Sequence, residues 1–81
     1  MKIIVTMEIF TTGQMIDIQI DRKQRIKTTL KVLAENRMEF IPFEHNSVIR
    51  IKNSGRRILT DQTYEEAGIY NGTILLLEKM A

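Results

Sequence analysis

The chain has 81 residues, and its 12 Lys and Arg against 10 Asp and Glu leave a formal net charge of +2, too small a bias to imply nucleic acid as a partner. This length predicts a single domain over residues 1–81, and the absence of cysteine excludes a disulfide scaffold, a thiolate zinc site and a cysteine nucleophile. Because no stretch approaches the roughly 20 apolar residues of a membrane span, we expect a cytoplasmic protein.

The first twenty residues predict a β-hairpin. Two runs alternate between apolar and polar side chains with a period of two, which is typical of half-buried strands. Between them lies a short loop, residues 11–13, whose Gly13 can take the left-handed position of a bulged hairpin turn. The residues expected to point inward are Ile3, Val5, Met7 and Ile9 in the first strand and Ile16, Ile18 and Ile20 in the second.

A helix is predicted to begin at Asp21, whose carboxylate can cap the backbone amides while Gln24 reaches back in a capping box. The helix is expected to fade around Asn36, because Arg37 would otherwise fall on the buried face. The residues that share this face at helical spacing, and that should lie on the sheet, are Ile26, Thr29, Leu30 and Leu33.

The middle of the chain predicts two further strands. Residues 38–43 read as an apolar connection in which Pro42 prevents an easy continuation of the helix. Period-two patterning resumes over residues 48–52, with Ile49 and Ile51 inward, and residues 53–55 turn the chain into a short strand over residues 56–59. The resulting order of strands and helices fits an α+β fold, a β-grasp roll in which a mixed sheet of four to five strands wraps one helix.

The last third predicts a short strand, a one-turn helix ended by Gly68 in a left-handed cap, a tight turn and an apolar closing strand. This order resembles the end of a ubiquitin-like domain. The run Gly68-Ile69-x-Asn71-Gly72-x-x-Leu75-x-Leu77 resembles the closing motif of the YukD/EsaB proteins, small ubiquitin-like components of Gram-positive type VII secretion. Thr73 departs from this family's pattern, which usually has an aspartate there.

No pattern in the sequence predicts catalysis, a cofactor or a metal site. The single histidine, His45, lies in a polar loop and is read as solvated, and the adjacent Glu65 and Glu66 diverge on a short helix. Covalent tags and sulfur carriers of the β-grasp class need a terminal glycine, whereas Gly72 is the last glycine here. We therefore expect a protein that is not conjugated, and whose last residues, 79–81, are dispensable.

Two surfaces are candidates for binding. The first is the outer face of the sheet, with an apolar centre of Ile4, Ile74 and Leu76 rimmed by two cations; its members are Ile4, Thr6, Val48, Arg50, Lys52, Ile74 and Leu76. The second is a stripe of lysines spaced four apart on the helix, Lys23, Lys27 and Lys31, for which a solvated basic flank is the alternative reading.

The favoured interpretation is a ubiquitin-like module that binds proteins through its sheet face. The resemblance to YukD/EsaB proteins implies a cytosolic accessory or regulatory component that works with the membrane-bound machinery of type VII secretion. A homodimer through the sheet face is a further partner assignment. The alternative function is a small basic nucleic-acid-binding module that uses the lysine stripe, and a steep salt dependence would distinguish it.

Overall fold

The computed structural model describes residues 1–45 and 47–79, and its centre is a mixed five-stranded sheet in the order β2-β1-β5-β3-β4. β1 and β5 run parallel in the middle of the sheet, and the other neighbouring strands pair antiparallel. The strands are β1 (Lys2–Ile9), β2 (Met15–Asp21), β3 (Ser47–Ile51), β4 (Arg57–Ile58) and β5 (Ile74–Lys79). This topology is the β-grasp roll that the sequence predicts.

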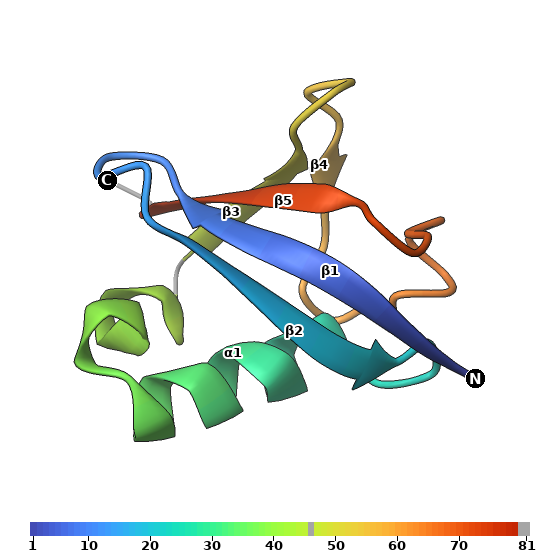
Figure 1. Ribbon diagram of the computed structural model, residues 1–81, viewed down its shortest axis with the longest axis horizontal. Coiled ribbons are helices and arrows are strands. Elements are labelled where there is room, and N and C mark those ends of the chain that lie inside the picture. The colour runs from blue at the N-terminus through green and yellow to red at the C-terminus, as the bar shows by residue number, and fades with distance from the viewer. Residues whose placement is uncertain (46, 80–81) are drawn as a thin grey trace.

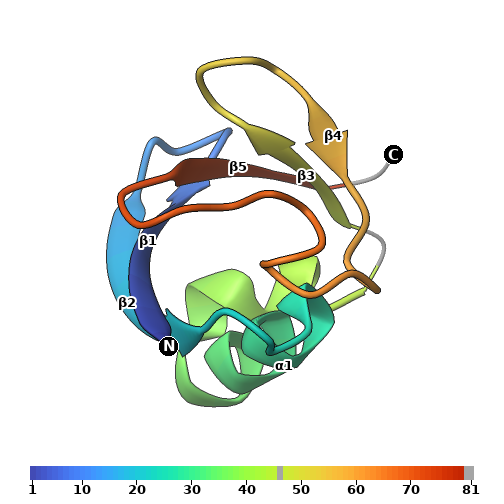
Figure 2. The ribbon, with the colours of Figure 1, turned by 90° about the vertical axis from the view of Figure 1, so that its right-hand side faces the viewer.

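One helix, α1 (Ile26–Asn36), lies in the concave side of the sheet and is followed by a short 3-10 helix, η1 (Met38–Phe43) (Figures 1 and 2). The predicted inward faces of β1 and α1 are confirmed. Val5, Met7 and Ile26 are fully buried between the two layers, and Leu75 and Leu77 of β5 join them. Figure 2 shows the sheet curling around the helix, so that a single core fills the roll.

The predicted start of the helix at Asp21 is wrong. Asp21 is the last residue of β2, opposite Lys2, and its carboxylate accepts the Lys23 amide in a turn (2.9 Å). The helix begins at Ile26, where the Ile26 amide donates to the Gln62 carbonyl (3.0 Å) and the Lys27 amide donates to the Thr60 carbonyl (2.9 Å). A loop that is distant in sequence thus accepts hydrogen bonds from the free amides at the start of the helix. A side-chain cap usually provides such an acceptor.

Three other boundaries differ from the sequence expectation. Residues 38–43 are not an irregular connection but form η1, which holds Pro42 within it and buries Phe40 and Phe43 against the core. The fourth strand is shorter than predicted. Lys79, expected to lie beyond the closing strand, is its last residue and pairs with Ser47. The expectation that residues 80 and 81 are dispensable concerns positions outside the described residues.

The segment that follows β4 is a series of turns held by its own side chains. Thr63 and Glu66 form a reciprocal capping box, in which the Thr63 amide donates to the Glu66 carboxylate (2.9 Å) and the Glu66 amide donates to the Thr63 hydroxyl (3.0 Å). The turn ends at Gly68, whose φ of 72° confirms the predicted left-handed cap. The expected one-turn helix is therefore a capped turn, and it buries Tyr64 completely beneath α1.

Candidate functional site

The outer face of the sheet is the surface that the sequence singles out, and strand register determines which residues meet on it. Thr6 lies opposite Ile74, and Leu76 lies between Glu8 on β1 and Arg50 on β3. Val48, Lys52 and Ile4 complete the expected set: Val48 is opposite Glu78, the Lys52 amide donates to the Ile74 carbonyl (2.9 Å), and Ile4 lies at the end of the paired region. The fold thus brings all seven predicted residues onto one face.

Ile4 is the most exposed of the three central aliphatic residues, at 50% of its full accessibility, whereas Ile74 and Leu76 are only partly exposed. It is held at the edge of the turn before β5, because the Ile4 amide donates to Asn71 Oδ1 (2.8 Å) and the Gly72 amide donates to the Ile4 carbonyl (2.7 Å). The φ of 89° at Gly72 allows this turn. Asn71 therefore fixes the position of Ile4, a role that the sequence motif alone did not indicate.

The two cations do not form the free basic rim that the sequence suggested. Lys52 Nζ lies 2.8 Å from the Glu8 carboxylate, and Arg50 Nε lies 3.1 Å from the Glu78 carboxylate. The Arg50–Glu78 pair joins β3 to β5, and the Lys52–Glu8 pair joins β1 to the turn after β3, since the predicted strand over 48–52 ends at Ile51; both pairs cross the outer face of the sheet. Strand alternation places Glu8 and Glu78 on this face, but the cation that each one meets depends on the order of strands in the sheet, which period-two patterning does not encode.

The apolar part of the outer face also extends farther than predicted. Phe10 follows β1, and its amide still donates to the Leu77 carbonyl (3.0 Å), so the pairing with β5 continues through it. Its ring is 59% exposed, and Leu59, the residue after β4, is 61% exposed. Phe10 continues the outward alternation of β1 and adds apolar surface to the outer face at the end away from Ile4, whereas Leu59 lies in the turn that follows β4.

The predicted lysine stripe is not formed as expected. Lys23 lies in the turn before α1, so only Lys27 and Lys31 belong to the helix. Lys27 Nζ is 2.9 Å from Asp61, and this hydrogen bond and charge lower the pKa of the Asp61 carboxyl. Arg22, the neighbouring cation, is 3.5 Å from Glu65. The basic surface is thus smaller and more neutralised than a row of three free lysines.

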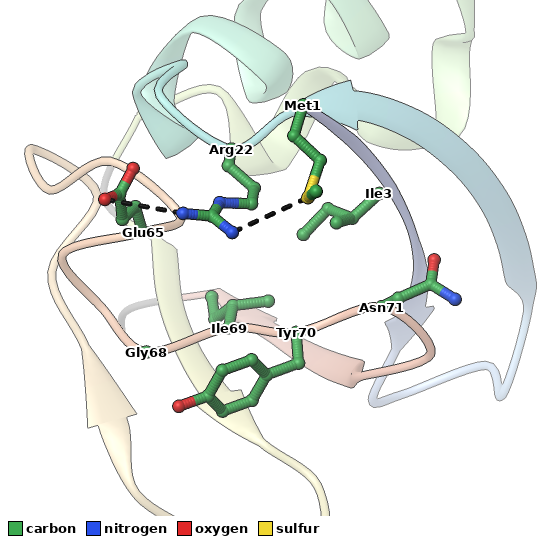
Figure 3. A pocket seen from close by; sticks show the side chains of 8 residues that line it. All are labelled: Met1, Ile3, Arg22, Glu65, Gly68, Ile69, Tyr70 and Asn71. Atoms are coloured by element: carbon green, nitrogen blue, oxygen red, sulfur yellow. Dashed lines mark hydrogen bonds and ion pairs between the residues drawn. The ribbon is translucent and has the colours of Figure 1, made fainter.

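A shallow hollow of about 470 Å³ lies between the start of β1 and the loop before β5 (Figure 3). Ile3 and Ile69 give it an apolar floor, and the Arg22–Glu65 ion pair crosses one side. Figure 3 shows the Tyr70 ring directed away from Arg22, and this ring is 76% exposed. The hollow offers apolar contact and one neutralised ion pair, and none of its side chains pairs a nucleophile with a base.

The carboxyl groups whose pKa values are shifted are partners in structural hydrogen bonds and ion pairs. Backbone hydrogen bonding lowers the pKa of Asp21 through the Lys23 amide and that of Glu66 through the Thr63 amide, while Arg37 lowers the pKa of Glu39. A general acid needs the opposite shift. His45 is exposed beside Glu44, and residues 1–45 and 47–79 contain no group of three or more acidic, histidine or cysteine side chains placed to hold a metal ion.

Over the same residues, no helix combines the length and apolar character needed to cross a membrane. No protein-family model matches the chain, and no curated protein matches it. Solved structures, in contrast, are similar to the chain. A de novo protein designed on the basis of ubiquitin is similar over 95% of this chain and 87% of its own, with a TM-score of 0.75 and 19% identity.

Two natural proteins are also similar to the chain over nearly its whole length. Ubiquitin of Caldiarchaeum subterraneum is similar over 100% of this chain and 96% of its own, with a TM-score of 0.75 and 17% identity. The ubiquitin-like domain of an Arabidopsis thaliana protein is similar over 99% of this chain and 79% of its own, with a TM-score of 0.74 and 16% identity. At these identities the likeness concerns the fold alone, and that fold is the ubiquitin-like β-grasp.

Proposed function

We propose that this chain is a protein-interaction module that docks non-covalently through the outer face of its sheet. The observation that carries the proposal is the exposure of aliphatic side chains on neighbouring strands of one sheet. Ile4 is half exposed and lies diagonal to Ile74, with Leu76 two residues farther along β5. A partner that covers these side chains gains apolar burial without any rearrangement of the sheet.

The ion pairs on the same face contribute specificity. Glu8 and Lys52 are already paired with each other, as are Glu78 and Arg50, so a partner need not neutralise isolated charges when it covers the apolar residues. A partner of wrong shape would break these pairs and leave charges without water or a counterion, which is unfavourable. The face therefore suits a largely apolar protein surface with a polar margin.

The biological setting we propose is a cytosolic accessory or regulatory role in a type VII secretion system, with the membrane-bound machinery as the partner. The support for this part is the resemblance of residues 68–77 to the YukD/EsaB closing motif. The expectation that the protein is not conjugated belongs to the same proposal, and the presence of higher-mass covalent adducts in the host would contradict it. A genomic position beside a secretion ATPase and small WXG-motif proteins is the expected context.

The decisive experiment is export of the WXG-type substrates in the host after the gene is replaced by variants. Ile4→Asp and Leu76→Asp place an unpaired carboxylate at the contact, and we expect export to fall about tenfold or more while the purified variants stay folded. The matched control is the double variant Lys27→Glu with Lys31→Glu, which should leave export unchanged. Normal export by both sheet-face variants would refute the proposed surface.

A further inference from the structure

β2 is an open margin of the sheet. Figure 2 shows β2 at one margin of the curled sheet and β4 at the other. β4 has only two residues, but β2 pairs with β1 without a bulge from Met15 to Asp21, and its other side has no strand beside it among residues 1–45 and 47–79. Natural sheets usually protect such a margin by shortening it, by placing charges or a proline on it, or by adding a bulge. β2 has seven residues with no bulge and no proline, and its charges are the exposed Asp17 and Asp21, so any pairing must keep these carboxylates apart.

The hydrogen-bonding pattern shows which groups of β2 are free. The Ile9 amide donates to the Gln14 carbonyl (2.8 Å), and the Arg22 amide donates to the Met1 carbonyl (3.1 Å). Because hydrogen-bonded residues alternate along an antiparallel strand, the even-numbered residues of β2 bond to β1. Asp17 and Gln19 therefore direct their backbone N–H and C=O groups away from the sheet, and no group of the described residues bonds to them.

Only a peptide backbone matches such a row of alternating donors and acceptors, and the sequence of β2 suits a second copy of itself. A pair centred on Asp17 would place two Asp17 carboxylates opposite each other, and one centred on Gln19 would place Asp17 opposite Asp21. Like charges directly opposite are destabilising. A pair centred on Ile18 avoids both conflicts, because it places Asp17 opposite Gln19 of the second copy and Ile16 opposite Ile20.

We propose that two copies of this chain pair antiparallel through β2, with a two-fold axis through Ile18. Asp17 and Gln19 then form the hydrogen-bonded pairs, and each pair exchanges both backbone bonds. The axis also lies beside the groove of about 290 Å³ between β2 and α1, which Ile18 and Val32 line. Val32 is 48% exposed in the single chain, and pairing covers this side of the groove. The dimer is closed, because each copy uses its one long free edge.

This interface is distinct from the outer face and stands or falls independently of the proposed function. The first test is sedimentation of the full chain over a concentration series reaching about 1 mM, where even a weak pair is populated. We expect the wild type to shift from monomer to dimer. Gln19→Pro removes an outward N–H but no bond to β1, so it should fold and lose the dimer. Gln19→Asp, which faces Asp17 of the second copy, should do the same without any change of backbone.

The second test reports the register. The sequence has no cysteine, so Ile18→Cys introduces a single thiol at the axis, where the two Cα atoms of a non-hydrogen-bonded pair lie about 4.5 Å apart. We expect this variant to form an intermolecular disulfide under mild oxidation. Asp17→Cys and Gln19→Cys should each form no intermolecular disulfide alone and crosslink only when the two are mixed.

Three results would overturn the proposal. They are a wild type that stays monomeric throughout the series, a dimer that persists in both folded Gln19 variants, and disulfide formation by Gln19→Cys alone but not by Ile18→Cys. Leu76→Asp separates this inference from the proposed function, since it should leave the dimer intact. Loss of the dimer in Leu76→Asp with retention in Gln19→Asp would assign self-association to the outer face and reject the edge.

Discussion

The two faces of β5 carry similar aliphatic side chains but have different roles. Leu75 and Leu77 are fully buried in the roll, while Ile74 and Leu76, one residue away on the same strand, remain partly exposed beside ion pairs. The inner face stabilises the fold, and the outer face is free to contact other molecules. Hydrophobic composition alone does not separate these roles, because only strand register assigns each leucine to its side.

The largest effect expected from this comparison is that of Leu75→Asp. A carboxylate at a fully buried site with apolar neighbours costs about 5 kcal/mol or more, which is comparable to the whole stability of a small domain. Circular dichroism should show an unfolded chain. Leu76→Asp is the matched variant, and its melting curve should lie close to that of the wild type. Equal destabilisation by the two substitutions would show that the faces are not separated as described.

The second effect concerns Tyr64, which is fully buried on the inner side with no hydrogen bond to its hydroxyl. Burial raises the pKa of Tyr64 to about 12, and the nearby Thr29 hydroxyl opposes a smaller part of this shift. The unfolded chain, with a tyrosine pKa near 10, therefore releases this proton first as pH rises. Stability should be unaffected below pH 10 and fall by about 2–3 kcal/mol as pH approaches 12.

Tyr64→Phe tests this explanation, since it removes the titrating group and an unsatisfied hydroxyl. At neutral pH the free energy of unfolding should change by no more than about 1 kcal/mol. Between pH 10 and 12 the variant should lose less stability than the wild type in parallel urea titrations. Parallel declines for both proteins would mean that other groups cause the alkaline loss.

A smaller effect is expected at the end of the outer face. Asn71→Ala removes the side-chain acceptor of the Ile4 amide and should cost about 1 kcal/mol of unfolding free energy. Amide hydrogen exchange should accelerate at Ile4 more than at Val5, which lies in the same strand. Asn71→Asp keeps an acceptor oxygen and should restore most of the protection at Ile4.

The smallest effect is expected from the ion pairs of the outer face. Glu8→Gln breaks the pair with Lys52 and should change stability by about 0–1 kcal/mol, with a smaller difference in high salt. The double variant with Lys52→Met measures their coupling in a thermodynamic cycle. A coupling above about 2 kcal/mol would show that the outer face contributes to the fold nearly as much as a core contact.

Sequence patterns predicted the parts of the fold that depend on local alternation and turns. The inward series of β1, the buried face of α1, and the positive φ of Gly13 and Gly68 are local features and were predicted correctly. The start of α1 was predicted wrongly. Asp21-x-x-Gln24 and Thr63-x-x-Glu66 both match the capping-box pattern, but only the second pair forms a capping box. What distinguishes them is the strand partner of Asp21, which is a tertiary contact.

The candidate surface was predicted in outline for the same reason. Alternation assigned its seven residues to one face, but the partners of Arg50 and Lys52 are 28 and 44 residues away along the chain. Such pairs follow from the order of strands in the sheet. The free edge of β2 likewise depends on that order, because its sequence looks like any half-buried strand.

The parallel pairing of β1 with β5 has a consequence for how this domain folds during synthesis. β1 must lie beside β5, so the centre of the sheet closes only around a segment that is synthesised long after β1. Until those residues leave the ribosome, β1 and β2 can form only an isolated hairpin, which is marginal in water. Folding of this domain is therefore expected to wait for β5, and until then the exposed inner face of β1 is available to chaperones.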